Sequence, residues 1–284
     1  MFNVWWFMKK KKAGLSYYGT IDALSVARYD LAATTVGNYA LFGGGYPTSN
    51  VVDAYDTSLT RTTPTALSVG RRYLAATTVG NYALFGGGYG GGYSNVVDAY
   101  DTSLTRTTAT ALSVARYSLA ATTVGDYALF GGGSTISTYF NAVDAYDTDL
   151  TRTIPTALSV ARSLLAATTI GNYALFGGGS TGSASDVVDA YDTSLTRTTP
   201  TALSVARSNL AATTVGDYAL FGGGYGSAYS KVVDAYDTSL TRTTPTALSV
   251  ARSNLAATTV GNYALFGGGY GSAYSNKVDV YRVF

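Results

Sequence analysis

The chain contains no cysteine, histidine, glutamate or glutamine among its 284 residues. Without cysteine and histidine, disulfide bonds, thiolate chemistry and imidazole metal sites are excluded, and we expect no cofactor. Charged residues make up only 13% of the chain and the net charge is +2, so the sequence shows no basic face of the kind that binds nucleic acid. No apolar run approaches 18 residues, and we therefore expect no transmembrane segment.

Residues 1–14 match nothing in the rest of the chain and hold both tryptophans, both methionines and four of the six lysines. A secretory signal places its positive charge before a longer apolar segment, whereas here the lysines follow the apolar residues. We therefore recognise no signal peptide, and the sequence leaves the compartment open. We interpret residues 1–14 as a disordered leader, the alternative being a short interfacial anchor with Trp5 and Trp6 in the lipid headgroup region.

What the sequence does contain is a repeat near 45 residues. The stretch Tyr39–Gly45, YALFGGG, recurs six times, and its phenylalanine is spaced by 43, 45, 46, 45 and 45 residues. A repeat of this period indicates units that share one continuous core, and we treat residues 15–284 as one domain.

Each unit reads as four short strands. In the first copy, Leu31–Val36 and Tyr39–Phe42 are separated by Gly-Asn, a two-residue hairpin signal, and Val51–Asp56 and Thr60–Thr65 follow. The fourth strand ends at a proline in most copies, which is tolerated only at a sheet edge. Four strands per unit and six units predict an all-β, six-bladed β-propeller of four-stranded antiparallel blades.

The chain ends predict how the ring closes. The sixth copy stops after its third strand, while Leu15–Arg28 aligns with the segment that carries the fourth strand elsewhere, for example Ser239–Arg252. We therefore expect Ser16–Asp22 to complete the last blade as its outer strand and to remove an open seam.

These residues resemble the kelch repeat family over about residues 15–284. The resemblance rests on an Arg before the inner strand, a small-residue strand, a Gly-Asn or Gly-Asp turn, Tyr-Ala-Leu-Phe-Gly-Gly and a spaced Val-Asp-Ala-Tyr-Asp. It implies a six-bladed kelch-type propeller, similar also to kelch-like arrays of bacterial or phage-associated surface proteins. The family's outer-strand Trp is replaced by a leucine such as Leu59, which can still pack between blades.

Candidate catalytic groups are few. Asp53 and Asp56 recur in nearly every copy, whereas an enzyme needs one asymmetric site, so we interpret them as structural. Kelch-type oxidases need His and Cys, and sialidase-type propellers need Glu, none of which the chain contains. We therefore expect a protein that is not an enzyme.

One arginine precedes each inner strand, and two interpretations of this series stay open. The kelch resemblance places the position toward the mouth of the central channel, where six guanidiniums would form an anion-binding ring. Alternatively each pairs with a neighbouring Asp or with loop carbonyls. The six are Arg28, Arg71, Arg116, Arg162, Arg207 and Arg252.

The copies differ mainly in one loop. Between the third glycine and the Val-Asp of the third strand they have 6, 8, 9, 8, 8 and 8 residues, which accounts for the whole spacing series. A second variable place is the pair after each arginine, such as Tyr29-Asp30 or Arg72-Tyr73. Both places fall on one face of an up-and-down propeller, and their Tyr, Ser, Gly and Asn content is typical of binding loops. The candidate aromatic residues are Tyr46, Tyr89, Tyr93, Tyr139, Phe140, Tyr225, Tyr229, Tyr270 and Tyr274.

Three functions fit this pattern. The first is a non-enzymatic recognition module that binds a protein or a glycan through the variable face around the arginine ring, acting as a monomer. The second is a carbohydrate-binding or carbohydrate-active propeller with its site in the central channel. The third is a structural spacer in a surface or virion assembly.

Overall fold

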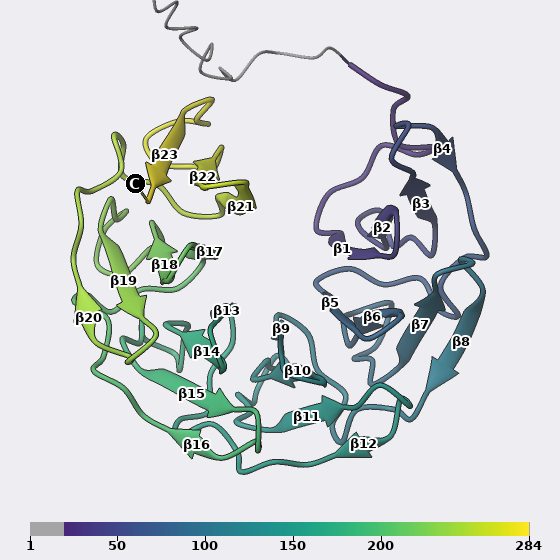
Figure 1. The fold of residues 1–284 in the computed structure, drawn as a ribbon, viewed down its shortest axis with the longest axis horizontal. Helices are drawn as coiled ribbons and strands as arrows, with labels where there is room; N and C mark the ends of the chain where they lie inside the picture. The colour runs from purple at the N-terminus through teal and green to yellow at the C-terminus, as the bar shows by residue number, and fades with distance from the viewer. Residues whose placement is uncertain (1–19, 284) are drawn as a thin grey trace, which may run out of the picture.

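The structure, a computed structural model, describes residues 20–283, and all regular secondary structure in that range is β-strand. Six antiparallel sheets follow one another along the chain and surround a common axis (Figure 1). The predicted fold class is confirmed: the chain is a six-bladed β-propeller. Residues 1–14 and the first part of the expected closing strand, Ser16–Gly19, lie outside the described residues.

Within each blade the strands are hydrogen-bonded in chain order, from the axis outward (Figure 1). The inner strands are β1 (Ala32–Val36), β5 (Ala75–Val79), β9 (Ala120–Val124), β13 (Ala166–Ile170), β17 (Ala211–Val215) and β21 (Ala256–Val260). The second strands are β2 (Tyr39–Gly43), β6 (Tyr82–Gly86), β10 (Tyr127–Gly131), β14 (Tyr173–Gly177), β18 (Tyr218–Gly222) and β22 (Tyr263–Gly267). The third strands are β3 (Val52–Tyr55), β7 (Val97–Asp101), β11 (Val143–Tyr146), β15 (Val188–Asp192), β19 (Val233–Asp237) and β23 (Val278–Arg282). The outer strands are β4 (Arg61–Thr62), β8 (Arg106–Ala109), β12 (Arg152–Thr153), β16 (Arg197–Thr198) and β20 (Arg242–Thr243).

The local sequence explains these boundaries. Val36 pairs with Tyr39 across Gly37-Asn38, and Gly37 has a φ of 52°, which confirms the predicted two-residue hairpin. All five outer strands are shorter than predicted, and four of them end before their proline, because proline has no N–H to donate to the ladder. The exception is β8, where Ala109 stands in place of proline and pairs with Val97.

The core lies between the blades. Ala32, Leu41 and Val52 of blade 1 (β1–β4) pack with Phe85 and Tyr100 of blade 2 (β5–β8), and equivalent clusters recur at the next four interfaces. The repeated leucine at the third-to-outer-strand turn also packs there in blades 2–5, as for Leu104.

In blades 1–5, this packing requires the first glycine of the Gly-Gly-Gly run. A Cβ at Gly43 would lie 2.7 Å from Phe85 Cε1, closer than any real contact, so the phenylalanine of one blade rests on the glycine of the blade before it. The next glycine, Gly44, has a φ of 74° and approaches the Arg71 carbonyl of blade 2, a conformation and a distance that only glycine tolerates.

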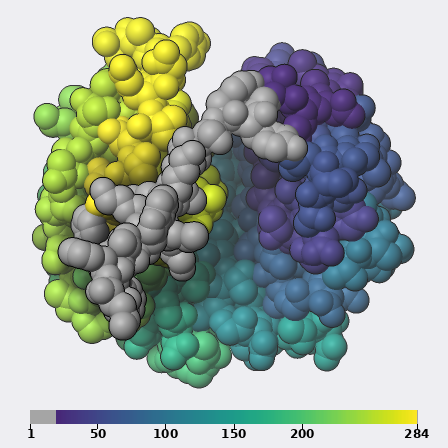
Figure 2. Space-filling view, turned by 45° about the horizontal axis from the view of Figure 1, so that its top comes forward, coloured from purple at the N-terminus to yellow at the C-terminus, as the bar shows by residue number. Residues whose placement is uncertain are grey.

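Blade 6 (β21–β23) has three strands in the described residues, and it does not pack on blade 1. Val260, Val278 and Val280 are 53%, 56% and 52% exposed, whereas Val36, the counterpart of Val260 in blade 1, is 1% exposed. A Cβ at Gly267 would meet only Val278, at 3.5 Å, where the other blades meet a phenylalanine. The two blades stand on opposite sides of an opening in the ring (Figures 1 and 2).

The expected closure stays a prediction. Thr20–Asp22, the part of the closing segment that the structure describes, forms no strand, and the Asp22 carbonyl accepts a 2.8 Å hydrogen bond from the Tyr55 hydroxyl of blade 1. The same bond joins the Tyr100 hydroxyl to the carbonyl of Thr65, which lies just beyond β4, the outer strand of the preceding blade. Asp22 therefore already has the contact that a closed ring requires on the blade 1 side.

Candidate functional site

The two ends of the propeller differ as the sequence predicts. A Cβ added at Gly37, in the first turn of blade 1, would lie 3.2 Å from Cγ2 of Thr102, in the last turn of blade 2, so both kinds of turn lie on one face. The loops between the second and third strands and the connections between blades lie on the other face, which we call the loop face. All variation in repeat length therefore falls on the loop face.

A common backbone carries the variable side chains of the loop face. The residue after the third glycine forms an isolated antiparallel β-bridge with the residue after the repeated arginine, as Tyr46 does with Tyr29 and Tyr89 does with Arg72. In the second pair the Arg72 N–H donates to the Tyr89 carbonyl at 3.0 Å and the Tyr89 N–H donates to the Arg72 carbonyl at 2.8 Å. Because these hydrogen bonds join backbone groups, the side chains can change from blade to blade while the backbone conformation stays the same.

Six tyrosines from blades 1–3 gather around Arg72, and we call them the first tyrosine cluster. The Arg72 Cζ lies 4.8 Å from the Tyr46 ring centroid, 5.2 Å from that of Tyr73 and 5.8 Å from that of Tyr89. The Tyr93 ring stacks on Tyr117 with centroids 5.8 Å apart and an interplanar angle of 11°. The members are Tyr29, Tyr46, Tyr73, Tyr89, Tyr93 and Tyr117.

A second tyrosine cluster lies on blades 5 (β17–β20) and 6. Tyr225 and Tyr229 are 5.1 Å apart between centroids, Tyr229 and Tyr270 are 5.8 Å apart, and Tyr270 and Tyr274 are 5.2 Å apart. The Tyr274 side chain is almost fully exposed. Blade 4 (β13–β16) has serine and alanine at the bridging positions, so the two clusters are separate.

The two remaining predicted aromatic residues lie in the longest loop, that of blade 3 (β9–β12). Tyr139 is exposed and bridges Ser134, whereas Phe140 is half-buried. Neither has a ring contact with another aromatic residue of the described chain. They belong to the loop face but to neither cluster.

The mouth of the central channel on the loop face is a cavity of about 340 Å³. One residue from each blade lines this cavity, and we call these six residues the rim. Five leucines, among them Leu74 and Leu119, also line it. All six rim residues have a φ between 52° and 56°, a left-handed backbone conformation that is uncommon for residues other than glycine. The rim consists of Asp30, Tyr73, Ser118, Leu164, Asn209 and Asn254.

Backbone hydrogen bonds connect the rim residues from blade to blade. The Tyr73 N–H donates to the Asp30 carbonyl at 3.1 Å, and the series continues to Asn254, whose N–H donates to Asn209 at 2.9 Å. Burial, and then the Asp30 carboxylate beside its hydroxyl, raise the pKa of Tyr73. The sequence marks these positions as variable but does not reveal that their side chains share one cavity.

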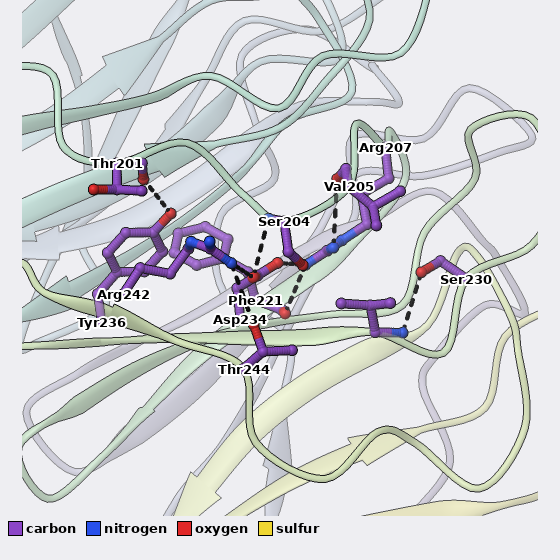
Figure 3. Close-up of polar contacts among 11 residues, drawn as sticks. Thr201, Ser204, Val205, Arg207, Phe221, Ser230, Asp234, Tyr236, Arg242 and Thr244 are labelled. Carbon is purple, nitrogen blue, oxygen red and sulfur yellow. Dashed lines mark hydrogen bonds and ion pairs between the residues drawn. The ribbon is translucent and has the colours of Figure 1, made fainter.

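The repeated arginines do not line this cavity. The Arg207 side chain is fully buried, donates to the Phe221 carbonyl at 3.0 Å and forms a 2.7 Å ion pair with Asp234 (Figure 3). The other five have the same kind of ion pair, with distances of 2.7–2.8 Å. Of the two arrangements that the sequence leaves open, the structure shows pairing with Asp, and the expected arginine ring at the channel mouth is replaced by six interior pairs.

Each buried carboxylate except that of blade 6 also meets a second arginine, from its own outer strand. Arg242 lies 2.9 Å from Asp234, which further accepts the Ser204 N–H at 3.1 Å (Figure 3). Burial raises the pKa of Asp234, but the two arginines and Ser204 outweigh it, and the net shift is downward. A carboxylate held in this way is a structural ion, not a proton carrier.

The second repeated aspartate caps a turn. Asp237 accepts hydrogen bonds from the Ser239 and Thr241 N–H groups, both at 2.9 Å, and hydrogen bonding to the Ser239 side chain lowers its pKa. The structural interpretation of both aspartates therefore rests on observed contacts.

The opposite end of the channel is lined by threonines, and the cavity there measures about 680 Å³. At the five interfaces between blades 1 and 6 along the chain, a pair of these hydroxyls joins neighbouring blades, as Thr77 and Thr123 do at 2.9 Å. Among residues 20–283 no group of three or more acidic side chains is placed to hold a metal ion, and no helix in that range could cross a membrane.

Comparison with known proteins adds no assignment. The chain matches no protein-family model, and no curated protein is significantly similar to it. The propeller is compatible with a kelch-type repeat, and membership of that family stays a prediction.

Proposed function

We propose that this propeller is a non-enzymatic recognition module that binds a protein or a glycan through its loop face. The observation that carries the proposal is the first tyrosine cluster, in which rings from three blades form one continuous patch on the face where the repeats differ. Tyrosine offers large, rigid contact area with a polar end, which is why it dominates binding loops.

The contrast between the faces supports this function. Tyr218 and Tyr263 on the opposite face are exposed to the same extent as Tyr225 and Tyr270 on the loop face, but they start regular strands and recur in every copy. Tyrosines of the loop face are absent from blade 4 and concentrated in two groups. Free variation of surface loops explains why the loops differ between blades, but not why tyrosine is abundant in them.

A pull-down from the native source tests the proposal. The wild-type chain is compared with a variant that carries Ser at positions 89, 93, 225 and 229 in place of Tyr. We expect the wild type to retain a protein or glycan that the variant does not, because aromatic anchors carry most of the energy of an interface. Equal retention of that partner by both proteins contradicts the proposal.

A carbohydrate site in the channel mouth is the second candidate. The cavity there has a leucine floor and a rim of hydroxyl, amide and carboxylate groups, the mixture that small polar ligands with apolar faces require. Binding or turnover of model glycosides that is lost in Asn209→Leu supports this candidate. An Asn209→Leu variant with unchanged binding removes it.

A further inference from the structure

Blade 2 departs from the repeat at one charged position. The residue after the repeated arginine is Arg72 in blade 2, whereas it is Tyr29, Tyr117, Ser163, Ser208 and Ser253 in the other blades. Since serine and tyrosine serve the same backbone bridge elsewhere, the fold does not require a cation here. The guanidinium of Arg72 is an addition to the scaffold.

Arg72 differs from the repeated arginines in its partners. Both repeated series pair with aspartates, as Arg71 and Arg106 do with Asp98, but within residues 20–283 no carboxylate lies within ion-pair distance of Arg72. Three tyrosine rings hold the group in place through cation–π contacts, so a positive charge is held on the loop face with no ion-pair partner among the described residues.

A guanidinium that has no ion-pair partner favours a planar anion as its ligand. Guanidinium presents a fork of N–H donors that matches a carboxylate, and a single fork matches a single carboxylate better than a polyphosphate, which needs several cations. The side chains around Arg72 are flat phenol rings, whose negative faces attract the C–H hydrogens of a sugar ring.

The neighbouring rim supplies partners for hydroxyl groups. Tyr73 contacts Arg72 on one side and Asp30 on the other, so the cluster and the channel mouth are continuous. Oδ2 of Asp30 is buried and has no hydrogen-bond partner among the described residues, and Ser118, Asn209 and Asn254 complete the polar rim. An extended peptide is disfavoured, because the bridges between loops leave no free strand edge for it to join.

From these observations we propose that Arg72 binds the carboxylate of an acidic sugar, of the uronic-acid class, whose ring stacks on the first tyrosine cluster. The inference rests on the proposed function and specifies its ligand. Tyr89 and Tyr93 provide the stacking faces, and Asp30 with the rim amides accepts and donates to the sugar hydroxyls.

Calorimetric titration with three probes tests the proposal. The probes are trigalacturonate, the neutral trisaccharide trigalactose and a tetra-aspartate peptide with blocked ends. The variants are Arg72→Ser, which restores the residue of blades 4–6 and so keeps the fold, and the double variant Tyr89→Ser/Tyr93→Ser. We expect the wild type to prefer trigalacturonate over trigalactose, and Arg72→Ser to bind trigalacturonate about 10- to 100-fold more weakly, as loss of a charged hydrogen bond predicts. Trigalactose binding should not change.

The outcomes separate this inference from the proposed function. Equal wild-type affinity for the two trisaccharides, no binding of trigalacturonate, or a preference for the peptide overturns the acidic-sugar ligand. A preference that survives Arg72→Ser overturns the role of Arg72. If the tyrosine variant loses the partner of the pull-down while Arg72→Ser binds every probe like the wild type, the recognition function stands and this inference fails.

Discussion

Replacement of Asp234 by Asn tests whether the repeated carboxylates are structural. Asp234 and Arg207 are both fully buried and lie 2.7 Å apart. Asparagine fits the same space but removes the charge, which leaves the Arg207 guanidinium buried with carbonyl acceptors alone. Removing one partner of a buried ion pair costs about 3–5 kcal/mol, because the remaining charge is not compensated. For a domain of this size each kcal/mol lowers Tm by roughly 2 °C or more, so we expect a loss of about 6–10 °C.

Asp237→Asn is the matched control. Asp237 lies on the same strand, β19, but is only half-buried, and the amide oxygen of asparagine can still accept the turn N–H groups. We expect only a small change in Tm, measured by calorimetry on both variants. Equal unfolding temperatures for Asp234→Asn and Asp237→Asn would refute the structural assignment of the buried aspartates.

We also expect the effect of Asp234→Asn on Tm to depend on pH. The folded-state pKa of Asp234 is lowered, so its contribution is present above the unfolded-state value near 3.9 and is lost as pH falls through the folded-state pKa. The difference in Tm between wild type and Asp234→Asn should therefore narrow below about pH 4. A difference that stays constant from pH 7 to pH 3 contradicts this linkage.

Three further predictions concern the packing of the blades. Gly131→Ala should destabilise the protein by about 1–3 kcal/mol in urea unfolding, because the added Cβ would lie 2.7 Å from Phe176 Cε1; a neutral effect contradicts the packing. Burial, and then Asp279, raise the pKa of Tyr281 to about 12. The contribution of Tyr281 to the free energy of unfolding is therefore present below pH 10, the unfolded-state pKa, and is lost as pH rises through 12. Tyr281→Phe should reduce this loss of stability at alkaline pH, and an unchanged dependence of stability on pH above 10 refutes the assignment. If the ring closes, Thr35→Cys/Thr258→Cys should form an intramolecular disulfide on oxidation, since the equivalent hydroxyls lie 2.8–2.9 Å apart at the other interfaces; two free thiols after oxidation contradict closure.

The repeated sequence pattern predicts the fold because its local signals agree with one another. The Gly37-Asn38 turn, the small-residue inner strand and the proline of the outer strand each specify one part of a blade, and a period of 45 residues repeats the choice six times. The loop face is predicted for the same reason, since strand direction decides on which side each connection lies. The predicted outer strands are too long, and the closure of the ring stays a prediction.

The side-chain partners could not be predicted in the same way. The sequence shows that Arg207 and Asp234 both recur, but either could face water, and only the packing between blades shows that they meet in the interior. The rim was not predictable, because residues such as Tyr73 and Leu164 rarely adopt a positive φ. Arg72 stands out as a departure from the repeat, yet the three rings in contact with it come from two blades, and their meeting depends on how the blades pack.

The central claim is that recognition takes place on the loop face. The most direct measurement is the affinity of the partner isolated by pull-down for two matched double variants, Tyr46→Ser/Tyr73→Ser in the first tyrosine cluster of the loop face and Tyr218→Ser/Tyr263→Ser on the opposite face. The four side chains are 37–40% exposed, so both variants remove the same kind of surface. We predict a loss of at least about tenfold in affinity for the loop-face variant alone, as expected for aromatic anchors. Equal affinities for the two variants, or a loss confined to the opposite face, would contradict the account.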